Sequence, residues 1–177
     1  RIARGGKPGD DEREFRLALL QPTQTCKNKE AACAGGTFGP VSPKRNEVPP
    51  LDERSYVPAG TTALHDAFGR TIDELGQRLA ATPEPERPGQ VIVALLTDGM
   101  ENASRDHTLK QIRQRVQRQP EKYGWVFLFL AAGQDAVLEG EKLAIPAAQA
   151  FSFAPTAQGV REAHEVLSAE VSRRKKH

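Results

Sequence analysis

Residues 91–97 read VIVALLT, a continuous run of β-branched residues, alanine and leucine that is interrupted by no charged or amide side chain. A strand with one solvated face alternates apolar and polar residues, whereas a strand covered on both faces of a parallel sheet does not. The run therefore predicts a central strand of a parallel sheet. Asp98 and Gly99 follow it directly.

Segments with helix and strand patterns alternate around this run. Apolar residues that recur every three or four positions indicate amphipathic helices, and short apolar runs bounded by turn residues indicate buried strands. We expect Asp106 to cap the second helix and Pro120 to lie just past its end. The alternation predicts an α/β fold with a doubly wound, mostly parallel sheet and helices on both faces. The expected strands cover residues 15–21, 91–97, 125–133 and 150–153, and the expected helices cover residues 61–81, 106–119, 135–143 and 156–173.

The length of the chain suits a single core, so residues 1–177 are expected to form one partial domain. Residues 59–173 are its regular α/β part. Residues 22–58 are rich in Pro and Gly and predict a connection of low order with at most a short edge hairpin. Cys26 and Cys33 have no histidine or second cysteine pair nearby to complete a zinc site, and the sequence leaves open whether they pair with each other.

The charge balance gives no reason to expect a nucleic-acid or membrane partner. The chain carries 25 Lys and Arg against 23 Asp and Glu, and this net charge of +2 is too small to attract either. No apolar run approaches the roughly 20 residues of a membrane span, and we expect a cytoplasmic protein. Because the first residue is Arg rather than Met, we expect the natural chain to start further upstream.

Ligands of open parallel sheets bind beyond the carboxyl ends of the strands, where the strand order reverses. The loops expected at that edge are 58–62, 97–105 and 131–135. The carboxylate of Asp98 either binds the backbone of its own turn or points outward as a ligand. Thr61 and Thr62 either cap the helix that follows them or offer hydroxyl groups to a metal ion.

Two of these segments, GTTALHDAF (60–68) and VIVALLTDGMENAS (91–104), resemble the second and third metal-site segments of a von Willebrand factor type A (vWA) domain. Together with KYGWVFLFLAAGQDA and IPAAQAFSF, they resemble the compact vWA domains of intracellular bacterial or phage proteins over residues 47–172. The resemblance implies a Rossmann-like, doubly wound fold. It also implies a metal-ion-dependent adhesion site (MIDAS) built by three loops.

The resemblance assigns the metal ligands of the second and third loops to Thr62 and Asp98. Thr61 falls where the family usually has a small residue, and capping is its expected role. Thr61, Asp66 and Asn102 are the candidates for supporting the ligands by hydrogen bonds. The implied cofactor is Mg²⁺ or Mn²⁺, and the implied partner is a protein whose acidic side chain completes the coordination of the metal.

The first metal-site loop of the family, Asp-x-Ser-x-Ser, is absent from this chain. In the family this loop follows the first strand, which is central in the sheet. If residues 15–21 are the second strand, the first strand and three oxygen ligands are missing. We therefore expect metal binding by this chain to be weak or absent. The edges of strands 15–21 and 91–97 would be left unpaired unless these two strands meet each other.

These observations favour a protein-interaction module with an incomplete MIDAS. An alternative is a metal-independent scaffold or regulatory domain that binds through an exposed face, such as the basic face with Lys110, Arg113 and Arg118. An α/β enzyme that holds a phosphate at the helix start near Thr61 and Thr62 ranks last. The chain has no lysine-containing phosphate loop, no nucleophile elbow and no cysteine with a catalytic partner, so we expect no enzymatic activity.

Overall fold

The computed structural model of the 177-residue chain describes residues 15–20 and 62–174. For residues 15–20 it describes the backbone alone. The expected connection at 22–58, Cys26, Cys33 and Thr61 lie outside the described residues.

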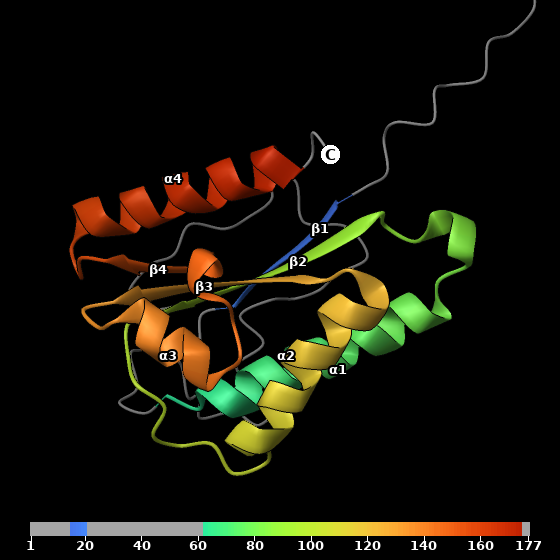
Figure 1. The fold of residues 1–177 in the computed structure, drawn as a ribbon, viewed down its shortest axis with the longest axis horizontal. Coiled ribbons are helices and arrows are strands. Elements are labelled where there is room, and N and C mark those ends of the chain that lie inside the picture. The colour runs from blue at the N-terminus through green and yellow to red at the C-terminus, as the bar shows by residue number, and fades with distance from the viewer. Residues whose placement is uncertain (1–14, 21–61, 175–177) are drawn as a thin grey trace, which may run out of the picture.

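The described strands form one parallel sheet of four strands in the order β1-β2-β3-β4 (Figure 1). The expected central strand is confirmed, because β2 is paired on both sides and every residue from Val91 to Thr97 is buried. The strands span Phe15–Leu20 (β1), Gln90–Thr97 (β2), Val126–Ala132 (β3) and Ala150–Phe153 (β4).

Helices cover both faces of the sheet, as expected: α1, α2 and α3 lie on one face and α4 lies on the other (Figure 1). In the part of the chain with described helices, none combines the length and apolar character that a membrane span needs. The α-helices span Leu64–Ala81 (α1), Leu109–Tyr123 (α2), Ala136–Lys142 (α3) and Ala157–Arg174 (α4), with short 3-10 turns at Glu84–Glu86 (η2) and Ala147–Gln149 (η3).

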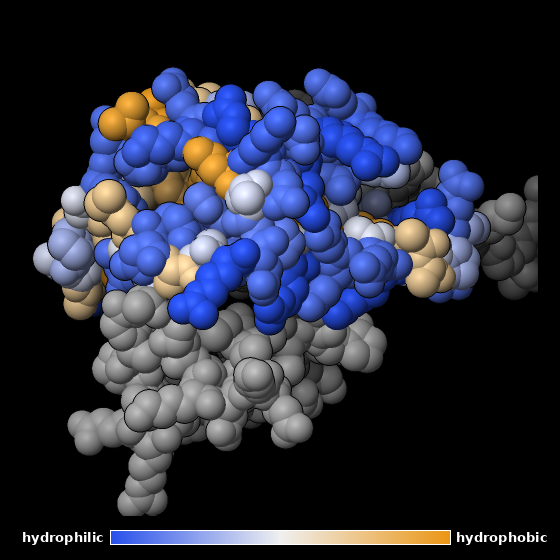
Figure 2. All heavy atoms as spheres, turned by 90° about the horizontal axis from the view of Figure 1, so that it is seen from below, coloured by the Kyte–Doolittle hydropathy of each residue, from blue (hydrophilic) through white to orange (hydrophobic). Residues whose placement is uncertain are grey.

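Alternate residues of β2 enter two separate cores. Val91, Val93 and Leu95 join the larger core beneath α1, α2 and α3. There the rings of Phe68 and Phe127 meet edge to face at a centroid distance of 5.5 Å, and burying such a ring contributes about 1.5–3 kcal/mol. By contrast, hydrophilic residues cover most of the coloured, described part of the face in Figure 2, where hydrophobic residues form only small separate groups. The sheet is therefore held by apolar contacts on both of its faces.

The second helix differs from the expectation at both ends. Its N-cap is Thr108 rather than Asp106, because Thr108 and Gln111 form a capping box in which each side chain binds the other's backbone N–H. Pro120 lies inside the helix rather than past its end. The helix continues to Gly124, which terminates it in the left-handed conformation with a φ of 66°.

β1 pairs directly with β2 over six residue pairs, from Phe15 opposite Gln90 to Leu20 opposite Leu95. The two strands that were expected to flank a missing strand thus meet each other. Among the four described strands the order runs in one direction, without the reversal that double winding requires. The carboxyl ends of β2 and β3 nevertheless open at the same edge of the sheet, where the ligand-binding loops were expected.

Candidate functional site

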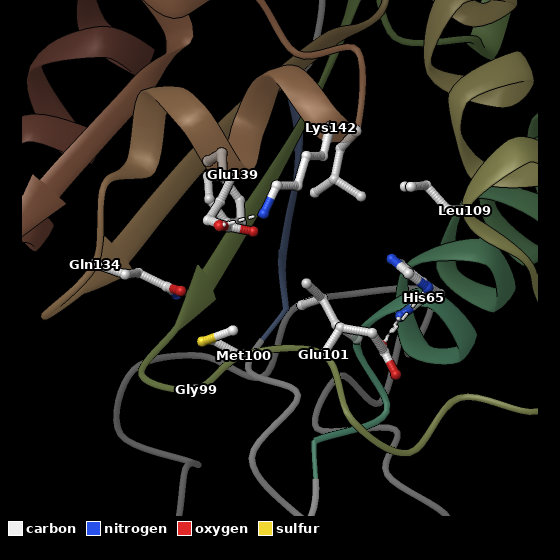
Figure 3. Close-up of a pocket in the computed structure, with 11 residues that line it drawn as sticks. His65, Gly99, Met100, Glu101, Leu109, Gln134, Glu139 and Lys142 are labelled. Atoms are coloured by element: carbon white, nitrogen blue, oxygen red, sulfur yellow. Dashed lines mark hydrogen bonds and ion pairs between the residues drawn. The ribbon is translucent and has the colours of Figure 1, made fainter.

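A hollow of about 180 Å³ opens at the carboxyl edge of the sheet, between the start of α1, the loop after β2 and helix α3 (Figure 3). Two pairs of polar side chains lie on opposite sides of it: Glu139 with Lys142, and His65 with Glu101. The side chain of Met100 lies between them. The lining residues are Leu64, His65, Gly99, Met100, Glu101, Leu109, Phe129, Gln134, Glu139, Lys142 and Leu143.

Thr62 is held against the loop that follows β2. Its backbone N–H donates to Asn102 Oδ1 at 2.8 Å, and its carbonyl accepts from the Asn102 N–H at 3.1 Å. Its hydroxyl lies so close to Gly99 that a Cβ added there would be 2.9 Å from Thr62 Oγ1. A residue at position 99 without a side chain therefore allows the Thr62 hydroxyl to approach the backbone of Gly99, the residue that follows Asp98. Asn102, a predicted supporting residue, does fix Thr62.

Asp98 is exposed, directly after the buried end of β2. The turn that follows it is made by Thr97, whose hydroxyl donates to the Gly99 carbonyl at 2.8 Å and accepts from the Gly99 N–H at 3.2 Å. The Asp98 side chain does not bind its own turn, which was one of its two expected roles. Within residues 62–174, no hydrogen bond or ion pair uses the Asp98 carboxylate, and no hydrogen bond uses the Thr62 hydroxyl.

Glu101 is the central acceptor of the loop, and the sequence did not single it out. Its oxygens accept from the N–H groups of His65, Ala103 and Ser104 and from the Ser104 hydroxyl, all at 2.7–2.9 Å. Burial raises the pKa of Glu101, but these hydrogen bonds outweigh burial and hold the pKa below its usual range. Its charge also lies at the N-terminus of α1, where the helix dipole stabilises an anion.

Helix α1 obtains its caps from this loop rather than from its own threonines. Its N-cap is Ala63, which has no capping side chain. The free N–H of His65 binds Glu101, and that of Asp66 binds Ser104 Oγ at 3.1 Å. The helix begins at Leu64 rather than at residue 61, which places the N-cap at Ala63; Thr61 itself lies outside the described residues. The sequence does contain a sign that this helix is capped from elsewhere, because the alanine at position 63 has no side chain that could accept a hydrogen bond.

Asp66 ties the first turn of α1 to the segment before α2. Its Oδ2 accepts from the N–H of Arg105 at 2.8 Å, and its Oδ1 accepts from the N–H groups of Asp106 and His107 at 2.9 and 2.7 Å. Burial raises the pKa of Asp66, but these bonds and the nearby His107 more than offset it and lower the pKa. Both carboxylate oxygens of this predicted supporting residue are thus committed to positioning the loop.

His107 packs between α1 and α2. Its ring lies against Gly69, and its side chain is only 17% exposed. Its Nδ1 is 3.6 Å from Asp66 Oδ1, and its Nε2 is 3.7 Å from Asp73 Oδ2. Asp73 in turn accepts two hydrogen bonds from Arg115 at 2.8 and 2.7 Å. These contacts join α1 to α2.

At the carboxyl edge of the sheet, the Thr62 hydroxyl and the Asp98 carboxylate form no hydrogen bond with a described residue. These hard oxygen donors suit Mg²⁺ or Mn²⁺. They fit part of a coordination shell, because an octahedral ion needs six donors. Within the described part of the chain, no group of three or more His, Cys, Asp or Glu side chains could hold a metal ion.

Compared with models of protein families, with curated proteins and with solved structures, the chain gives no match. An α/β fold by itself does not define a function. The function therefore has to be inferred from the loops at the carboxyl edge.

Proposed function

We propose that this chain is a vWA-type protein-interaction module with an incomplete MIDAS, related to the compact intracellular bacterial or phage type. Thr62 and Asp98 are two oxygen ligands of a bound Mg²⁺ or Mn²⁺, and an acidic side chain of a protein partner is a third. In the vWA family the sheet is doubly wound and a further central strand carries the Asp-x-Ser-x-Ser loop; such a strand would have to displace the direct pairing of β1 with β2 in this chain.

The single observation that carries the proposal is that the two side chains assigned to the metal accept no hydrogen bond from a described residue. The oxygens of Asp66 and Glu101 accept backbone N–H groups, and Asn102 Oδ1 accepts the Thr62 N–H. Thr62 Oγ1 and the Asp98 carboxylate have no such bond within residues 62–174. These are the two residues that the vWA resemblance assigns to the metal, whereas their neighbours build the loop that holds them.

The proposed metal binding by this chain is weak. One carboxylate supplies one negative charge, and water has to fill most of the six positions, so we expect a dissociation constant of the order of millimolar or weaker. A carboxylate from the partner would add a second charge to the shell. Partner binding and metal binding should therefore strengthen each other.

The proposal is tested by thermal unfolding with and without Mg²⁺ or Mn²⁺. One protein is the chain itself, and a second carries a fused strand with Asp-x-Ser-x-Ser before Arg1. We expect the cation to raise the melting temperature of the fused protein, and Asp98→Ala or Thr62→Ala to remove the increase. Glu165→Ala is the matched control, because Glu165 is an exposed carboxylate on α4, on the other face of the sheet. A fused protein that folds and shows no cation effect would refute the proposal.

A metal-independent scaffold is the second candidate, and the direct pairing of β1 with β2 favours it. This pairing closes the sheet without a further strand between them. The basic face considered for this role is partly occupied, because Arg113 donates to the carbonyl groups of Glu141 and Lys142 at 2.7 and 2.8 Å. Lys110 and Arg118 remain exposed. Partner binding that is unaffected by a chelator and by Thr62→Ala would favour the scaffold.

We propose no catalytic step for either candidate. A phosphate at the start of α1 would need the free N–H groups of the first turn. Those of His65 and Asp66 are already bound by Glu101 and Ser104. Turnover of a phosphoester by the purified protein would contradict this part of the proposal.

A further inference from the structure

We infer that the hollow beside Asp98 binds one large apolar side chain, of leucine or phenylalanine size, from the same partner that brings the acidic residue. This inference rests on the proposed function, because it describes the partner of that site. The occupant is a polypeptide in which an apolar residue lies within one or two positions of an acidic one.

The size and lining of the hollow suit a single side chain. Its volume of about 180 Å³ is below the roughly 300–1,000 Å³ of typical small-molecule pockets. A cavity of about 150 Å³ lined by Leu, Ile and Phe holds one benzene molecule. Here the buried residues Leu64, Phe129 and Leu143 supply apolar lining, and the Met100 side chain is 66% exposed beside them. An apolar group that enters would cover the Met100 side chain, so that its own apolar surface and that of Met100 would both be removed from water.

The charged side chains of the hollow are largely paired within the chain, whereas the amide of Gln134, which also lines it, forms no hydrogen bond to a described residue. The two oxygens of Glu101 are filled by loop donors, and Lys142 Nζ contacts Glu139 Oε1 at 2.6 Å. A ligand that binds Glu101 or Lys142 would have to break one of these bonds to gain its own. Glu101 and Glu139 together carry more negative charge than Lys142 balances, so the hollow itself also repels an anion.

The position of the hollow links it to the proposed metal site. Gly99 lines the hollow and directly follows Asp98. An extended peptide advances about 3.3 Å per residue, so neighbouring side chains of one partner segment can reach both places. The acidic residue then meets the cation beside Asp98, and the apolar residue enters the hollow. This pairing explains why Met100 is exposed at the edge instead of packed in the core.

The test is an NMR titration of the ¹⁵N-labelled chain with N-acetyl-phenylalanine amide and N-acetyl-leucine amide. We expect amide signals of Gly99, Gln134 and Lys142 to shift, and N-acetyl-serine amide to cause no such shift. Met100→Ser should weaken binding of the apolar probes roughly threefold by removing apolar contact area. Val160→Ser is the control, because Val160 is an exposed apolar residue on α4. Equal shifts with the serine probe, or no effect of Met100→Ser, would overturn the inference.

A second comparison separates this inference from the proposed function. The neutral apolar probes need no cation, so their failure to bind refutes the hollow as an anchor site and leaves metal binding by Asp98 intact. The peptides N-acetyl-Phe-Asp-amide and N-acetyl-Phe-Asn-amide are then compared in Mn²⁺. Tighter binding of the Asp peptide, lost in Asp98→Ala, supports the combined site. Equal binding of the two peptides contradicts the metal-mediated part, although the apolar anchor would stand.

Discussion

Replacing Asp66 by alanine should destabilise the protein clearly, although Asp66 lies close to the surface. The substitution removes the acceptor of three backbone N–H groups, those of Arg105, Asp106 and His107. The first two N–H groups can turn to water. The N–H of His107 is partly buried, and its side chain also loses the carboxylate 3.6 Å from Nδ1.

The expected magnitude follows from these three bonds. A buried donor left without an acceptor costs about 1–3 kcal/mol, and each bond that water replaces costs about 0.5–1.5 kcal/mol. We therefore expect a loss of about 2–6 kcal/mol in the free energy of unfolding. For a chain of this length, that corresponds to a fall of about 4–24 °C in melting temperature.

Urea and thermal unfolding followed by circular dichroism measure this loss. Asp106→Ala is the matched control on the same segment: the Asp106 carboxylate is 69% exposed, and it lies 4.0 Å from the Arg70 guanidinium. Such a surface pair contributes about 0–1 kcal/mol, so the control should change stability little. If Asp66→Ala and Asp106→Ala had the same small effect, the role assigned to Asp66 would be refuted.

The stability of wild type and that of Asp66→Ala should also respond differently to acid. The pKa of Asp66 is lowered in the folded protein, so the unfolded chain takes up a proton first as pH falls. Its contribution to stability is thus fully present above about pH 4 and is lost as pH falls through the folded pKa. We expect the stability difference between wild type and Asp66→Ala to be constant from pH 8 to pH 5 and to shrink below pH 4. An unchanged difference at low pH would contradict this assignment.

Two glycine substitutions test the close approaches at the edge. Gly99→Ala places a Cβ 2.9 Å from the Thr62 hydroxyl. It should lower the free energy of unfolding in urea by about 1–3 kcal/mol and weaken the response to cation. The control is Gly76→Ala, whose Cβ meets no atom within 4 Å and which should stabilise α1 by about 0.5–1 kcal/mol. Gly69→Ala places a Cβ 2.6 Å from Cγ of the His107 ring. We expect the free energy of unfolding to fall by about 1–3 kcal/mol. If the NMR signals of the His107 ring did not shift in this variant, the packing of His107 against Gly69 would be contradicted.

Local patterns in the sequence were enough to predict the elements of the sheet and its covering helices. The run at 91–97 has no alternation, and a strand buried on both faces is the arrangement that removes all of it from water. The strand at 150–153 was predicted at its observed bounds, because turn residues limit it on both sides. Elements whose bounds depend on residues within a few positions could thus be predicted.

Contacts between residues far apart in the chain could not be predicted in the same way. Asp106 and Thr108 are both good capping residues. The choice between them depends on Asp66, which lies 40 residues before Asp106 and accepts its N–H. Glu101 caps a helix that begins 37 residues before it in the sequence. Of the predicted site residues, Thr62 and Asp98 lie on loops that the structure brings together through Gly99.

A titration of the ¹⁵N-labelled chain with Mn²⁺ tests the proposed metal site most directly. Paramagnetic broadening of amide signals reports binding even when it is weak. We predict that the broadening is strongest at Thr62, Asp98 and Gly99 and is lost in Asp98→Ala but kept in Glu165→Ala. Broadening that is absent, or that is spread over exposed carboxylates and unchanged in Asp98→Ala, would contradict the proposal that this edge binds a cation.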